Sequence, residues 1–97
     1  MNLGDTIKMM RKERRITQKK LAEDIGISDT ALYNIEKNKS FPPKETISKI
    51  CKGLGVPVAH LMISCLTEED VPPEKREAFN LLIPLVKEAL FGQKVTK

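Results

Sequence analysis

Apolar residues recur at intervals of three and four along most of the chain, which is the spacing of one face of an α-helix. The alternation of apolar and polar residues that marks a half-buried strand does not occur in the sequence. Proline and glycine fall mostly between the periodic segments, where they begin or end helices. The pattern predicts an all-α fold with five helices and a further C-terminal helix. The expected inward faces of the first five helices are Leu3, Ile7 and Met10; Leu21, Ala22 and Ile25; Ala31, Leu32 and Ile35; Ile47, Ile50, Cys51 and Leu54; and Val58, Leu61 and Met62.

Turn residues set the expected ends of three of these helices. The first helix should run to about Arg14. The fourth is expected from Lys44 to about Gly53, with Gly55 as a C-terminal cap. Pro57 suits the first position of the fifth helix, because proline lacks the N–H that would be unsatisfied there.

Residues 17–42 form two predicted short helices joined by a tight turn, and the rest of the chain is organised around them. Thr17 can cap the first of these helices, since its hydroxyl can accept a backbone N–H. Gly26 can take the positive φ that ends a helix sharply. Ser28 or Asp29 then caps the second helix, and Asn38 tolerates the left-handed conformation that stops it. Two helices joined by a glycine-containing turn are typical of a DNA-binding helix-turn-helix.

The joint spacing of several residues in this stretch resembles the XRE family, the helix-turn-helix proteins of the phage Cro and repressor type. The matching residues are Thr17-Gln18, Leu21-Ala22, Gly26-Ile27-Ser28, Ile35-Glu36 and Pro42. The similarity extends from about Leu3 to Leu66, two-thirds of the chain. The resemblance implies a five-helix, phage-repressor-like DNA-binding domain over residues 1–66.

The resemblance also implies roles for single residues. Arg11 falls where the family keeps an arginine, and it should pair with Glu36 and lock the first helix to the end of the third. Gln18 matches the glutamine with which the family binds a DNA phosphate. Arg15 is a departure, because the family often has glycine there, so the turn that contains it should be slightly strained. Lysines near these elements are further phosphate candidates, namely Lys19, Lys37, Lys39 and Lys44. The first helix carries a basic run whose side chains should be mostly solvated, with one or two near phosphate, and its members are Lys8, Arg11, Lys12, Arg14 and Arg15.

By the same match, the N-terminal part of the third helix should read bases in the major groove. Asn34 can bond adenine at N6 and N7, and Thr30 offers a hydroxyl and a methyl that can pack on thymine. Asp29 either accepts from cytosine N4 or serves as the helix cap, and the cap is favoured because phosphates repel a carboxylate. The complete set of predicted base-reading residues is Ser28, Asp29, Thr30, Tyr33 and Asn34.

The distribution of charge favours a polyanionic partner. The chain has 97 residues and a net charge of +4. Residues 1–66 hold twelve Lys or Arg against seven Asp or Glu, a net charge of +5, whereas residues 67–97 carry −1. The basic charge therefore lies on the part that carries the motif, although many basic faces are merely solvated.

Residues 67–97 should form an acidic linker and a C-terminal helix from about Pro73 to Phe91. Pro84 lies inside this helix, where it should remove the bond to the Asn80 carbonyl and kink the helix. The helix carries more apolar surface than a terminal helix outside a complete domain should expose. We expect it to pair with a second subunit, and folding back on its own domain is the alternative. Residues 93–97 should be disordered. The predicted dimerisation residues are Phe79, Leu82, Ile83, Val86 and Leu90.

The sequence offers little chemistry beyond DNA binding. Cys51 and Cys65 have no His or Cys at metal-ligand spacing, and they fit small apolar thiols in a reducing cytosol. His60 is expected at the surface or half-buried, without a catalytic or metal role. No nucleophile–base pair is recognisable, so we expect neither an enzyme nor a cofactor. Without a signal peptide or an apolar run that could span a bilayer, a cytoplasmic protein is expected.

The sequence thus predicts a sequence-specific, double-stranded DNA-binding transcriptional regulator, most simply a repressor. A homodimer joined through the C-terminal helices should present two recognition helices about one DNA turn (~34 Å) apart to a palindromic operator. Two other classes stay open. One is the antitoxin of a toxin–antitoxin pair, which would bind the toxin through its tail and autoregulate its operon. The other is an interaction adaptor that has lost DNA binding and recruits protein through the tail.

Overall fold

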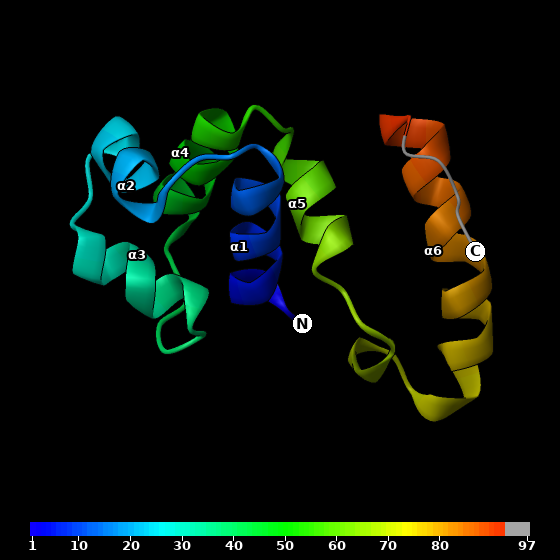
Figure 1. Ribbon diagram of the computed structural model, residues 1–97. Helices are drawn as coiled ribbons and strands as arrows, with labels where there is room; N and C mark the ends of the chain where they lie inside the picture. The colour runs from blue at the N-terminus through cyan, green and yellow to red at the C-terminus, as the bar shows by residue number, and fades with distance from the viewer. Residues whose placement is uncertain (93–97) are drawn as a thin grey trace.

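The computed structural model describes residues 1–92, and within them all regular structure is helical. In Figure 1, the first five α-helices gather into one body, and the sixth stands beside α5 on the side away from α2 and α3. The predicted all-α class is confirmed, while the expectation for residues 93–97 lies outside the described residues. The α-helices are α1 (Leu3–Glu13), α2 (Gln18–Ile25), α3 (Asp29–Glu36), α4 (Lys44–Leu54), α5 (Val58–Ser64) and α6 (Arg76–Phe91), with 3-10 helices at Glu68–Asp70 and Pro73–Lys75.

A single apolar core joins α1 to α5. Each helix contributes a completely buried aliphatic side chain: Ile7, Leu21, Leu32, Ile50 and Leu61 in chain order. All five come from the inward faces that the periodicity predicted. Full burial of such a side chain contributes about 1.5–3 kcal/mol, so the core fixes α2 and α3 on a scaffold built by the other three helices.

The chain around α2 and α3 follows the predicted cap chemistry. The Thr17 hydroxyl accepts a hydrogen bond from the Lys20 backbone N–H at 3.0 Å, and Gly26 ends α2 with a φ of 77°. Asn38 follows α3 with a φ of 61°. Arg15 has a φ of 58°, a left-handed value that costs a residue with a Cβ about 1–2 kcal/mol. The strain expected between α1 and α2 is therefore located at this residue.

Three helix ends differ by about one residue from the prediction. α1 ends at Glu13, and Arg14 is its C-terminal cap. α4 extends to Leu54, after which Gly55 closes it with a φ of 76°. Pro57 is the N-terminal cap of α5 rather than its first residue, because its ψ of 152° is extended.

α1 lies very close to the C-terminal end of α3. A Cβ on Gly4 would lie only 2.7 Å from the carbonyl oxygen of Glu36, and it would also clash with that of Ile35. The Asn38 side chain accepts a hydrogen bond from the Gly4 backbone N–H through Oδ1 at 2.9 Å. Glycine at position 4 thus permits the close approach, and Asn38 ties the loop after α3 to α1.

Local hydrogen bonds order the acidic linker before α6. The Met1 ammonium group donates to Asp70 Oδ1 at 2.8 Å, and the Thr67 backbone N–H donates to Asp70 Oδ2 at 2.7 Å. These bonds, led by the one from Met1, lower the pKa of the exposed Asp70 carboxyl. Thr67 and Asp70 also form a capping box around the first 3-10 helix. The linker therefore has defined structure where the sequence suggested only an acidic connection.

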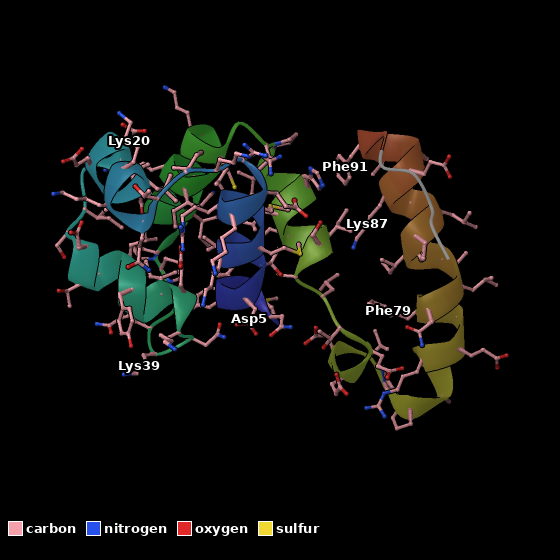
Figure 2. All side chains as sticks on the ribbon, in the orientation of Figure 1. Asp5, Lys20, Lys39, Phe79, Lys87 and Phe91 are labelled. Carbon is pink, nitrogen blue, oxygen red and sulfur yellow. The ribbon has the colours of Figure 1, made fainter. Side chains whose placement is uncertain are left out.

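α6 returns to the domain at its C-terminal end. It is helical through Pro84 as far as Phe91, and Gly92 ends it with a φ of 71°. The Phe91 ring stacks on the His60 ring of α5, with ring centroids 4.5 Å apart and 12° between the planes. Figure 2 shows Phe91 directed toward α5. His60 is only 8% exposed, so its expected surface or half-buried position was wrong. The stacked aromatic ring explains the difference, because the sequence alone did not reveal which residue would cover this histidine.

Candidate nucleic-acid interface

The first half of α3 turns a row of polar side chains to solvent. Ser28, Asp29 and Thr30 are exposed at its start, Tyr33 is 43% exposed one turn later, and Asn34 is half-buried. The opposite side of α3 lies in the core. These are the five residues predicted to read bases, and the structure brings them onto one short helix and its cap. The start of such a helix is the part that a helix-turn-helix inserts into the major groove.

Ser28 is the cap of α3. Its hydroxyl accepts a hydrogen bond from the Ala31 backbone N–H at 3.0 Å, and Asp29 is the first helical residue. The favoured interpretation of Asp29 as the cap was therefore wrong, because its neighbour already fills that position. The Asp29 carboxylate is exposed in the first turn, where the helix dipole stabilises negative charge. A hydrogen bond from cytosine N4 is the role that remains for it from the sequence analysis.

A buried ion pair links α1 to the end of α3. Arg11 donates to Glu36 through Nε at 2.7 Å and through Nη2 at 2.9 Å, one bond to each carboxylate oxygen. The remaining guanidinium nitrogen, Nη1, donates to the Ile16 carbonyl oxygen at 2.9 Å. Arg11 is 7% exposed and Glu36 is 3% exposed. Because desolvation offsets much of the attraction in such a pair, it positions the two helices more than it stabilises them.

Gln18 reaches the same carboxylate from the start of α2. Its Nε2 donates to Glu36 Oε1 at 3.1 Å, while Lys19 beside it is exposed. The free backbone N–H groups and the positive dipole end of a helix start favour an anion. The bond to Glu36 holds Gln18 in place at this helix start, and its contact with a DNA phosphate stays a prediction.

Two of the predicted phosphate-binding lysines, Lys37 and Lys39, lie close to the Tyr33 ring. The Nζ atoms of Lys37 and Lys39 each lie 5.7 Å from the centroid of the Tyr33 ring, within the range of a cation–π contact. Lys44 is exposed at the first position of α4 and lies at the rim of a separate, apolar hollow beside Phe41. The structure thus gathers Lys37 and Lys39 at the exposed side of α3 but not Lys44.

A hollow of about 280 Å³ brings predicted DNA-binding residues together with two lysines that were not among them. Lys8 and Lys12 belong to the basic run on α1, which the sequence predicted to be mostly solvated, with one or two members near phosphate. Their spacing of four residues, about one helical turn, was the available signal. Only the packing of α1 against α3 places them beside the predicted DNA-binding residues. The lining consists of Lys8, Arg11, Lys12, Gln18, Tyr33, Glu36 and Lys37.

The predicted dimerisation residues occupy different environments on α6. Phe79, Ile83 and Val86 are half-buried, and Figure 2 shows Phe79 on the side of α6 that faces the domain. Leu82 and Leu90 are exposed. α6 is therefore apolar on more than one side, and its contact with α5 covers only part of that surface. The exposed leucines on α6 are Leu81, Leu82, Leu85 and Leu90.

The part of the chain that the structure describes offers little else for chemistry. Cys51 and Cys65 are free and buried, as expected, and burial raises the pKa of both thiols. Within residues 1–92, no group of three or more His, Cys, Asp or Glu side chains could hold a metal ion. The helices of this part are also too short or too polar to cross a membrane.

The short helix α3 is capped at its start, tied to α1 near its end and polar on its outer side, which suits insertion into a DNA groove. Fold and site together define a protein of the DNA-binding helix-turn-helix class. Comparison with known families agrees, since residues 7–61 match the family described as helix-turn-helix. The chain therefore belongs to the XRE-type helix-turn-helix family.

Individual proteins are similar over most of this chain. The immunity repressor protein of Bacillus phage phi105 is 32% identical over 80 residues, which are 82% of this chain and 53% of that protein. The clp gene regulator ClgR from Corynebacterium glutamicum shares the fold, with a TM-score of 0.65 at 22% identity over 95% of this chain and 93% of that one. A chain of the SinR protein/SinI protein complex has a TM-score of 0.60 at 27% identity, over 93% and 80% of the two chains. The chain spans about half the length of the curated relatives it matches.

Proposed function

We propose that the chain is a sequence-specific, double-stranded DNA-binding transcriptional regulator that represses by occupying a promoter. The observation that carries this proposal is the exposed polar start of α3, capped by Ser28 and held on a helix-turn-helix scaffold. Similarity to a phage immunity repressor supports the regulatory role. Residues 1–66 would bind DNA and residues 67–97 would join subunits.

Base recognition falls to the outward side chains of α3. Asn34 would bond adenine at N6 and N7, and Thr30 would meet a base through its hydroxyl or methyl group. Asp29 would accept from cytosine N4, now that Ser28 is known to be the cap. Tyr33 would reach a phosphate or a sugar. Each good bidentate contact contributes about 1–3 kcal/mol of discrimination against a wrong base.

Contacts with the DNA backbone would fix the register of α3 in the groove. Gln18 and Lys19 at the start of α2, and Lys37 and Lys39 after α3, would contact phosphates of the DNA backbone. Binding should weaken steeply as salt rises, because each lysine that meets a phosphate releases a counterion. Lys44 would make a more peripheral contact, since it lies apart from the Tyr33 group.

The exposed leucines of α6 would join two copies of the chain. Leu81, Leu82 and Leu85 are 67%, 52% and 53% exposed, which is unusual for three neighbouring aliphatic side chains on a helix. α6 and α3 lie at opposite ends of the molecule in Figure 1, whose longest dimension is 40 Å. A dimer with its subunits extended from α6 would therefore place the half-sites about two DNA turns (~68 Å) apart, whereas subunits lying side by side would fit one turn (~34 Å).

A second candidate uses the same surface for another protein. The SinR neighbour was solved in a complex with the SinI protein, and the exposed leucines of α6 would suit an apolar helix of a different chain equally well. The antitoxin and adaptor alternatives both require such a partner. Sedimentation of the purified chain distinguishes these options, since self-association requires no added partner.

Transcription in vitro tests the regulatory role. The template would carry a bound site that overlaps the promoter, and a matched template would carry the same site far upstream. We expect the protein to reduce transcription only from the first template. An increase in transcript would contradict repression, and equal transcription from both templates at full occupancy would contradict promoter exclusion.

A further inference from the structure

The hollow between α1 and α3 is basic. Glu36 is the single carboxylate in its lining, and both of its oxygens already accept hydrogen bonds from Arg11 at 2.7 and 2.9 Å and from Gln18 at 3.1 Å. The charges of Arg11 and Glu36 cancel each other. The lysines of the lining form no ion pair with a carboxylate among residues 1–92. Three positive charges therefore remain unbalanced, those of Lys8, Lys12 and Lys37.

The size and donors of the hollow suit a phosphate group. Its volume is about 280 Å³. One water molecule occupies roughly 30 Å³ in the liquid, so the hollow has room for a phosphodiester group and some water. Each lysine carries three rotatable N–H donors on a flexible stem, which suits a point-charge contact to a phosphate oxygen. Tyr33 adds a hydroxyl, and Gln18 adds an amide that Glu36 holds in place.

We propose that this hollow binds a phosphate of the DNA backbone and that Lys8 and Lys12 are its principal cationic ligands. The assignment rests on the proposed DNA binding and extends it, because it adds α1 to the elements that touch DNA. We take the DNA backbone as the source of the phosphate because three other residues of the lining are themselves predicted DNA contacts. Gln18, Tyr33 and Lys37 line the hollow and are also predicted DNA contacts. A DNA strand that contacts all three would therefore run past the hollow.

The test compares salt dependence in two charge-matched double variants of the full chain. Lys8→Ala with Lys12→Ala removes the proposed ligands. Lys49→Ala with Lys52→Ala removes two lysines of α4 that line a different hollow beside Asp24. Affinity for a random-sequence duplex would be measured by fluorescence anisotropy over a salt series, since a phosphate contact does not depend on base sequence. Circular dichroism and melting would show that each variant is folded, and the pair Lys8→Gln with Lys12→Gln replaces the first variant where alanine disturbs α1.

We expect the slope of log K against log salt to fall by about 2 in the α1 variant and to stay at the wild-type value in the α4 variant. Affinity at 0.1 M salt should fall by about tenfold for each lost contact. An equal change in both variants, or none in the α1 variant, would overturn the assignment while leaving DNA binding intact. Failure of the wild-type chain to bind any duplex would overturn both proposals together.

A second arm separates the DNA backbone from a free anion. Inorganic phosphate would be titrated into the isotope-labelled chain without DNA, and amide shifts of α1 would be followed by NMR. Under the proposal these shifts stay small at millimolar phosphate, because one phosphate in an open hollow gains little binding energy without the rest of the duplex. Saturable binding at Lys8 and Lys12, combined with an unchanged salt slope on DNA, would instead make the hollow a free-anion site.

Discussion

Asn34 is the side chain on α3 with the most specific pairing chemistry, since its amide can donate and accept toward a single adenine. We predict that Asn34→Ala relaxes base preference at one position of each half-site and reduces discrimination there by about 1–3 kcal/mol. Binding to a panel of operators with single base changes measures this effect. Lys39→Ala is the contrasting variant, because loss of a phosphate contact should weaken all operators alike and flatten the salt slope by about 1. Unchanged preference in Asn34→Ala would remove this residue from the base readers.

Arg15 and Asn38 both have a left-handed backbone conformation, with φ values of 58° and 61°, but they differ in side-chain contacts. We predict that Arg15→Gly stabilises the fold by about 0.5–1 kcal/mol, because relief of the 1–2 kcal/mol strain exceeds the entropy that glycine adds to the unfolded chain. Asn38→Gly should not stabilise, because it removes the Oδ1 acceptor that bonds the Gly4 backbone N–H. Thermal melting of the two variants gives the comparison, and a lower melting temperature for Arg15→Gly would contradict the strain argument.

The residues whose roles followed from the sequence pattern alone depend on near neighbours in the chain, whereas the pairing of Arg11 with Glu36 was implied by the family resemblance. Thr17 and Gly26 act through hydrogen bonds and dihedral angles within a few residues, so their amino-acid types were enough to predict their roles as helix caps. The role of Gly4 could not be predicted in this way, because its lack of a Cβ matters only where α1 meets the end of α3. His60 was misplaced for the same reason, because its cover comes from Phe91, far along the chain.

At the scale of elements, the docking of α6 depends on few contacts. Its described residues include none that is fully buried, and the Phe91 ring on His60 is the stacked aromatic contact that joins it to α5. Near its start, Arg76 Nε donates to the Glu68 carbonyl oxygen at 2.9 Å. Such sparse anchoring predicts that α6 opens more readily than the five-helix core.

We predict that Phe91→Ala increases hydrogen exchange in α6 and shifts the His60 ring resonances, because the stacked ring is lost. Glu88→Ala is the control, because the Glu88 side chain is exposed on the same helix and is not among the residues proposed to join subunits. Exchange in α1 to α5 should stay the same in both variants. Equal exchange rates in Phe91→Ala and the wild-type chain would show that other contacts hold α6.

The helices themselves were largely predictable, because each carries its own apolar period and its own end signals. The arrangement of the helices relative to one another was less predictable. The hollow beside α3 exists because α1 approaches α3 closely. From the sequence, Lys8 and Lys12 were two members of a basic run, and which of its residues would lie near phosphate could not be predicted. Likewise, the apolar residues of α6 appeared as one broad stripe, whereas the structure separates half-buried Ile83 and Val86 from exposed Leu81 and Leu85.

At the scale of the whole molecule, the proposed dimer depends on the exposed leucines of α6. We predict that Leu85→Glu raises the dissociation constant of the dimer by at least about tenfold, because a carboxylate would be buried in an apolar interface without a partner. Sedimentation equilibrium measures this constant. Ala59→Glu adds the same charge at an exposed position on α5 and should leave self-association unchanged. A dimer unaffected by Leu85→Glu would place the subunit contact elsewhere.

Selection of bound DNA from a random pool, followed by sequencing, tests the central claim most directly. A DNA-binding dimer predicts an enriched palindrome whose half-sites are separated by a whole number of DNA turns, one or two according to how the subunits lie about α6. The enriched half-site should contain an adenine that loses its preference in the Asn34→Ala variant. A folded protein that enriches no sequence would contradict base recognition by α3 and would favour the adaptor role, in which α6 recruits another protein.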